Sequence, residues 1–139
     1  MLSGKLAVDA NPILSAAIGG KAGQVFLAGS ELEFLTVEPV LDEVEKYLPI
    51  LAAKKGLSLS LTKTALALLP LVVVPTREYA AFIGKAQELI GQRDPDDVPL
   101  LALALTYRYP VWTNDSDFQS IPGVEVITTA ELLSKLANN

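Results

Sequence analysis

The chain has 139 residues, of which half are hydrophobic and 19% are charged, with a net charge of −5 and neither histidine nor cysteine. This length is that of a single domain with a core of its own, and the composition excludes a disordered chain and a disulfide-stabilised scaffold. The acidic balance argues against a protein that coats nucleic acid through a basic face, but it does not exclude nucleic acid as a substrate.

Short apolar strands alternate with helices along the chain. In chain order, the predicted elements are a strand at 5–9, helices from residue 11 and at 22–29, a strand at 32–37, helices at 39–55 and 59–69, a strand at 71–74, helices at 76–90 and about 97–107, strands at 111–113 and 124–127, and a last helix from about 129. Such alternation is typical of a parallel sheet covered on both faces. We therefore expect one α/β domain, a three-layer α/β/α sandwich in which the helices at 39–55 and 59–69 form an inserted hairpin.

Residues that accept hydrogen bonds from free N–H groups stand at most of the predicted helix starts. The expected N-caps are Asn11 with Pro12 after it, Ser58, Thr76, Asp96 or Asp97, and Thr128 or Thr129. Glycine is expected to end three helices, at Gly29, Gly56 and Gly91.

No apolar run is long enough to cross a bilayer. The longest, 65–74 and 98–105, are short, and Pro70 interrupts the first. The N-terminal apolar run is also shorter than the core of a secretory signal. We expect a cytoplasmic protein.

Acidic residues stand at four separated places in the chain, and three of these places follow a predicted strand or open a predicted helix. The four places are Asp9, Glu43, the segment Asp94 to Asp97, and the segment Asp115 to Asp117. In a parallel sheet the carboxyl ends of the strands meet at one edge, where α/β proteins place their sites. Carboxylates about 4 Å apart repel each other by roughly 1 kcal/mol even in water-like dielectric, so a converging cluster indicates a bound cation. Oxygen ligands without imidazole or thiol favour Mg²⁺ or Mn²⁺ over zinc.

Each acidic position also has a simpler interpretation. Asp9 and Asn11 could only cap the first helix, Asp94 and Asp96 could cap the helix at 97–107, and the segment 115–117 is made of ordinary turn formers. Glu43 lies at the edge of an expected apolar stripe of Val40, Val44, Tyr47 and Leu51, where it could also reach solvent.

For Asp97 the sequence favours a functional role over a capping role. It opens a helix that is apolar on every face, and it stacks over Leu101 and Ala104, so its carboxylate should start from a buried face. The lysines and arginines that could contact phosphates are more often ordinary surface charges: Lys46, Lys54, Lys55, Arg77 and Arg93.

The chain resembles the PIN-domain nucleases, in particular small toxin ribonucleases of the VapC type. The resemblance rests on four segments: Val8-Asp9-Ala10-Asn11, Glu43, Asp94-Pro95-Asp96-Asp97 with Leu101-Ala102-Leu103-Ala104, and Trp112-Thr113-Asn114-Asp115-Ser116-Asp117-Phe118. The last segment is the most specific. The doubled acid before Leu101 departs from the single aspartate of many relatives.

The resemblance implies the roles of the site residues. Asp9, Glu43, Asp97 and Asp115 would be the catalytic acids that bind one or two Mg²⁺ or Mn²⁺ ions. Asp94 and Asp117 are further candidate ligands, and Asn11 and Thr113 would orient the ligands.

The resemblance also implies the fold and the activity. It implies the sheet order 3-2-1-4-5, metal-assisted hydrolysis of RNA phosphodiesters, a homodimer, and an antitoxin that binds the hairpin at about 39–69. Two other readings remain: a non-catalytic PIN-like module that binds RNA or protein, and a receiver domain. The receiver is disfavoured because Ala10, not a second acid, follows Asp9, and Thr128-Thr129, not lysine, follow the last strand.

Overall fold

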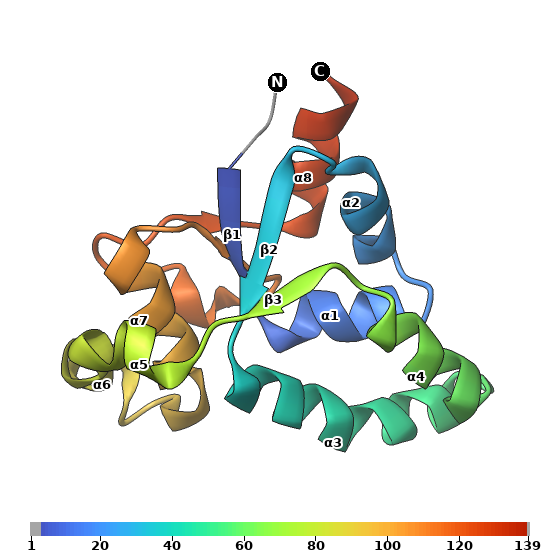
Figure 1. Ribbon diagram of the computed structural model, residues 1–139, viewed down its shortest axis with the longest axis horizontal. Coiled ribbons are helices and arrows are strands. Elements are labelled where there is room, and N and C mark those ends of the chain that lie inside the picture. The colour runs from blue at the N-terminus through green and yellow to red at the C-terminus, as the bar shows by residue number, and fades with distance from the viewer. Residues whose placement is uncertain (1–3, 139) are drawn as a thin grey trace.

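The strands form a five-stranded parallel sheet in the order β3-β2-β1-β4-β5. Figure 1 shows β1, β2 and β3 at the centre of the molecule. The computed structural model describes residues 4–138, without the side chain of Asp117. The strands are β1 (Gly4–Val8), β2 (Leu32–Thr36), β3 (Leu71–Val73), β4 (Val111–Trp112) and β5 (Val126–Ile127). Ala7 of the central strand is in register with Leu35 on one side and Val111 on the other. The predicted sheet order is confirmed.

Helices cover both faces of the sheet. They are α1 (Ala10–Ala17), α2 (Ala22–Ala28), α3 (Glu38–Lys54), α4 (Leu59–Ala67), α5 (Thr76–Tyr79), α6 (Ile83–Ile90), α7 (Val98–Tyr107) and α8 (Thr129–Ala137), with 3-10 turns at Ala80–Phe82, Pro95–Asp97 and Ser116–Phe118. Helices α5, α6 and α7 lie on one side, and α1, α2 and α8 on the other (Figure 1). Helices α3 and α4 form the predicted hairpin, which runs beyond the carboxyl ends of β1 and β2.

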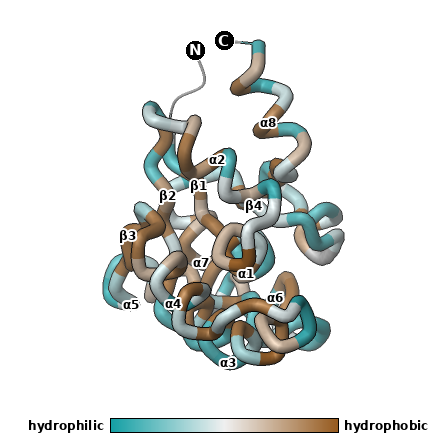
Figure 2. The backbone as a smooth tube through the Cα atoms, turned by 90° about the vertical axis from the view of Figure 1, so that its right-hand side faces the viewer, coloured by the Kyte–Doolittle hydropathy of each residue, from teal (hydrophilic) through white to brown (hydrophobic). Residues whose placement is uncertain are grey.

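The hydrophobic core lies on both faces of the sheet, and on one face it is formed with helix α7. Residues 100–104 of α7 and the last three residues of β1 are buried, and both segments are hydrophobic inside the molecule (Figure 2). On the opposite face the rings of Phe26, Phe34 and Trp112 pack together, with centroids 4.6–5.7 Å apart. Within residues 4–138 no helix combines the length and apolar character needed to span a bilayer.

Three local predictions were wrong. Asp9, not Asn11, is the N-cap of α1, because the helix already begins at Ala10. Pro12 therefore lies in the first turn of the helix, where the N–H that proline lacks would have no partner within the helix. The buried stripe of α3 continues from Val44 to Leu48, at a spacing of four residues, and leaves Tyr47 42% exposed.

The third correction concerns the helix expected at 76–90. It is divided into α5, a 3-10 turn and α6, and Thr76 is the first residue of α5 rather than its cap. The hydroxyl of Thr76 lies 3.3 Å from that of the buried Tyr79, and Gly84, the second residue of α6, has low helix propensity. Both features favour a break at this point.

Candidate active site

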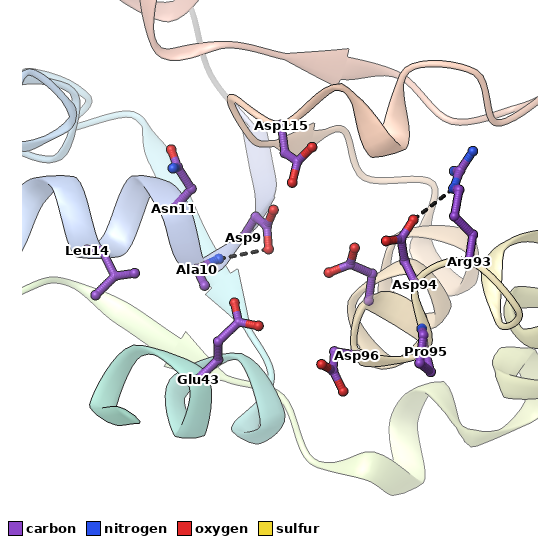
Figure 3. A pocket seen from close by; sticks show the side chains of 11 residues that line it. Asp9, Ala10, Asn11, Leu14, Glu43, Arg93, Asp94, Pro95, Asp96 and Asp115 are labelled. Atoms are coloured by element: carbon purple, nitrogen blue, oxygen red, sulfur yellow. Dashed lines mark hydrogen bonds and ion pairs between the residues drawn. The ribbon is translucent and has the colours of Figure 1, made fainter. Parts of the chain in front are cut away.

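A cleft of about 410 Å³ opens where β1 and β4 end, between α3 and the turn before α7. Six described carboxylates line it: Asp9, Glu43, Asp94, Asp96, Asp97 and Asp115. Asp9, Glu43 and Asp115 come from three different segments and point toward the same space (Figure 3). The fold thus brings the four predicted acids, Asp9, Glu43, Asp97 and Asp115, to one cleft.

Asp9 is held in place at the carboxyl end of the central strand. Its side chain is 7% exposed, its Oδ1 accepts a hydrogen bond from the Ala10 N–H at 2.8 Å, and its Oδ2 accepts one from Thr113 Oγ1 at 2.8 Å. Burial raises the pKa of Asp9 above its ordinary value, and the hydrogen bonds from Thr113 and Ala10 offset part of this rise. Asp9 therefore caps α1 through one oxygen and presents a carboxylate to the cleft.

Thr113 connects two of the acidic segments. It is fully buried after β4, and its hydroxyl donates to Asp9 and accepts from the backbone N–H of Asp115 at 3.0 Å. One side chain therefore fixes the orientation of the Asp9 carboxylate and the start of the turn that carries Asp115.

We expect Thr113→Val to destabilise the protein by about 1–3 kcal/mol, because the nearly isosteric change leaves Asp9 Oδ2 and the Asp115 N–H without this partner. Urea unfolding measures the effect. Thr64→Val is the control, since the Thr64 hydroxyl bonds only to a carbonyl on an exposed helix face. Equal stability of the two variants would mean that Thr113 does not hold the site together.

Asn114 supports the site from outside the cleft, a role that was not predicted from the sequence. Its Oδ1 accepts from the Thr129 N–H at the start of α8 at 2.9 Å, and its Nδ2 donates to Asn11 Oδ1 at 3.0 Å. The predicted ligand-orienting Asn11 is thus part of a link between α1, the turn after β4 and α8. In sequence Asn114 is indistinguishable from a turn former, because both partners are distant along the chain.

Glu43 reaches the cleft from α3 and is half-buried. Burial, followed by the charges of Asp9 and Asp96, raises the pKa of its carboxyl, and Lys46 offsets part of the rise. The negative charges in the cleft therefore act on one another through space.

The acids before α7 differ in their surroundings. Asp97 occupies the N-cap position of α7, yet its carboxylate makes no capping hydrogen bond. Asp94 forms an ion pair with Arg93, whose Nε lies 2.8 Å from Asp94 Oδ2. Asp115 is exposed, and the side chain of the further candidate Asp117 lies outside the described part of the structure.

The donor set fits a hard divalent cation. The titratable ligands that line the cleft are carboxylates, whose oxygens suit Mg²⁺ or Mn²⁺. In the described part of the chain, no three acids stand close enough to hold one ion as they are. Mutual repulsion keeps like charges apart, and a cation that offsets the charge would let them converge.

Comparisons with known proteins address the family and the fold. A family model described as "PIN domain" matches residues 7–137. The fold is similar to that in the crystal structure of VapBC2 from Rickettsia felis bound to a DNA fragment from their promoter, with a TM-score of 0.66 at 14% identity over 89% of this chain and 98% of that chain. A comparison with curated protein sequences finds no match.

Proposed function

The chain belongs to the PIN-domain family, and on this basis we propose that it is a divalent-metal-dependent ribonuclease. One observation carries the proposal: Asp9, Glu43, Asp97 and Asp115, which lie up to 106 residues apart in the numbering, line one cleft at the carboxyl edge of the sheet. These four acids would hold Mg²⁺ or Mn²⁺, and Asp94 and Asp117 are further candidates. A divalent ion bound there would supply an activated water and neutralise charge on the phosphate.

The chain's own residues would contribute placement and charge rather than a dedicated imidazole base. Ala10 and Thr113 hold the two oxygens of Asp9, and Thr113 also fixes the Asp115 backbone, so two of the acids are oriented before substrate arrives. The chain has no histidine to act as base. Proton transfer would then depend on water and on the carboxylates of the cleft.

The test is cleavage of labelled RNA by the purified protein with Mg²⁺ or Mn²⁺ and with EDTA. We expect cleavage with either ion, loss of cleavage in EDTA, and recovery when the metal is restored in excess. RNA that is bound but remains intact with both ions would favour the alternative, a non-catalytic binding module.

We also propose that the protein is the toxin of a toxin–antitoxin pair whose antitoxin packs on the α3–α4 hairpin. A hollow of about 590 Å³ lies between α3, α4 and β3, and its walls are largely apolar, including Leu48, Leu66 and Leu71. Leu61 of α4 and Leu68 at its end are 71% and 78% exposed, and they add to the apolar surface that this hairpin offers to a partner.

Co-expression with the product of the neighbouring small gene tests the antitoxin proposal. We expect a complex that co-purifies, and we expect Leu61→Asp to weaken it while leaving RNA cleavage unchanged. Co-purification unaffected by this change would place the partner elsewhere. The homodimer and the cytoplasmic location stay predictions, and light scattering in solution tests the first.

A further inference from the structure

A second hollow, of about 310 Å³, adjoins the acidic cleft. The two share Glu43, Pro95 and Asp96 in their walls, so a ligand that fills the cleft can continue directly into the hollow. Helix α3 forms one wall of the hollow and contributes Lys46 and Tyr47 to it in addition to Glu43. These residues are three and four positions after Glu43 and therefore lie on the same side of the helix.

Tyr47 and Lys46 place an aromatic ring and a cation side by side in this hollow. Tyr47 is 42% exposed, and the Lys46 Nζ lies 5.4 Å from the centroid of its ring. An exposed aromatic ring beside a cation is the combination that single-stranded nucleic acid requires, because the ring stacks on a base and the cation contacts the phosphate.

The rest of the hollow selects a base rather than a phosphate. Asp42 and Asp96 line it and repel an anionic group, whereas a neutral base carries N–H donors that carboxylates accept. Three further wall residues are Pro39, Pro95 and Pro99, which are rigid and have no backbone N–H to offer a phosphate. A planar, neutral ring with donor groups matches this lining.

We propose that this hollow is a nucleobase subsite, in which the base next to the cleaved phosphate stacks on Tyr47 and Lys46 contacts the neighbouring phosphate. The inference rests on the proposed ribonuclease function and deepens it. It requires an unpaired base at this position, since a base within a duplex has both faces stacked.

The subsite is separate from the surface proposed for the partner protein. Helix α3 turns Leu41, Glu45 and Leu48 toward the hollow against α4 and β3, and Lys46 and Tyr47 toward the nucleobase subsite. One helix thus serves two surfaces, and substitutions at Tyr47 should not affect binding on the other face.

The test compares Tyr47→Leu with Tyr47→Phe, and uses Tyr107→Leu as a matched control. Tyr107 is 40% exposed, close to the exposure of Tyr47, but it lies at the far end of α7, where its hydroxyl bonds to Glu78. The readouts are KM and kcat for cleavage of a short single-stranded RNA of randomised sequence, its affinity in Ca²⁺ by fluorescence anisotropy, and the thermal shift caused by Mn²⁺.

We expect Tyr47→Leu to raise KM and weaken RNA binding about tenfold, with kcat and the Mn²⁺ shift unchanged, because stacking on one base is lost. Tyr47→Phe keeps the ring and should bind like the wild type, as should Tyr107→Leu. Lys46→Gln should weaken binding and lower its dependence on salt concentration.

Other outcomes separate this inference from the proposed function. Cleavage by the wild type with equal RNA affinity of Tyr47→Leu would overturn the subsite and leave the ribonuclease. RNA binding without cleavage, weakened by Tyr47→Leu, would keep the subsite and remove the enzyme. A wild type that neither binds nor cleaves RNA would overturn both.

Discussion

Asp97→Asn should abolish metal-dependent RNA cleavage, lowering its rate by a factor on the order of 10³ or more, while the fold stays intact. The change removes one negative charge from the wall of the cleft and keeps the shape of the side chain. The Asp97 carboxylate makes no capping hydrogen bond that this change would remove, and Asn is as well suited to the N-cap position as Asp, so α7 should still begin at Val98. Single-turnover cleavage measures the rate, and circular dichroism checks the fold.

Asp94→Asn is the informative comparison, because Asp94 lies three residues away and lines the same cleft. Its carboxylate is paired with Arg93, so we expect a smaller loss of activity than for Asp97→Asn. Equal losses would mean that Asp94 shares the metal.

In growing cells the wild type should arrest growth and Asp97→Asn should not, whereas harmless expression of an active enzyme would contradict the toxin role.

The sheet and the position of the acids could be predicted because they depend on local patterns. Short apolar runs separated by helices predict parallel strands, and the strand order follows from the family resemblance. Asp9 follows β1 directly and Asp115 comes three residues after β4, so any parallel arrangement brings them to one edge. The buried α7 was also evident, because residues 98–105 are apolar on every face.

The contacts that orient the acids could not be predicted, since they join residues that are distant along the chain. The hydrogen bond from Thr113 to Asp9 spans 104 positions, and that from Asn114 to Asn11 spans 103. The exposure of Tyr47 could not be predicted for a different reason. It lies beside the apolar stripe of α3, and helical periodicity alone cannot separate a core residue from an exposed one at its edge.

Mn²⁺ should reverse the order of stability of the wild type and Glu43→Gln. Without metal at neutral pH, we expect Glu43→Gln to be the more stable protein, because it removes a charge that burial, Asp9 and Asp96 all disfavour. With Mn²⁺ at about 100 times its Kd, the wild type should gain about 2.7 kcal/mol, a rise in Tm on the order of 10 °C. The variant lacks one ligand and should gain less stability. When Tm is plotted against the Mn²⁺ concentration, the curves of the two proteins should therefore cross.

The control is Glu45→Gln, two residues along α3, whose side chain lines the hollow against α4 instead of the acidic cleft. It removes the same charge from the same helix, and its response to Mn²⁺ should match that of the wild type. A wild type that does not respond, or a Glu45→Gln response as weak as that of Glu43→Gln, would show that the acids do not form a metal site.

The pH dependence gives an independent check on the metal-free part of this prediction. The folded-state pKa of Glu43 lies above its ordinary value of 4.5, so the stability that its protonated form contributes is fully present below pH 4.5 and is lost as the pH rises through the folded pKa. The Glu43→Gln variant has no titrating group at this position. Its advantage in stability over the wild type should therefore vanish below pH 4.5 and grow as the pH rises. Mn²⁺ binds the ionised carboxylates, so its stabilisation of the wild type should weaken over the same range on acidification. A site built from repelling acids must show both trends together, whereas acids that serve only as caps and turn residues would show no dependence on Mn²⁺.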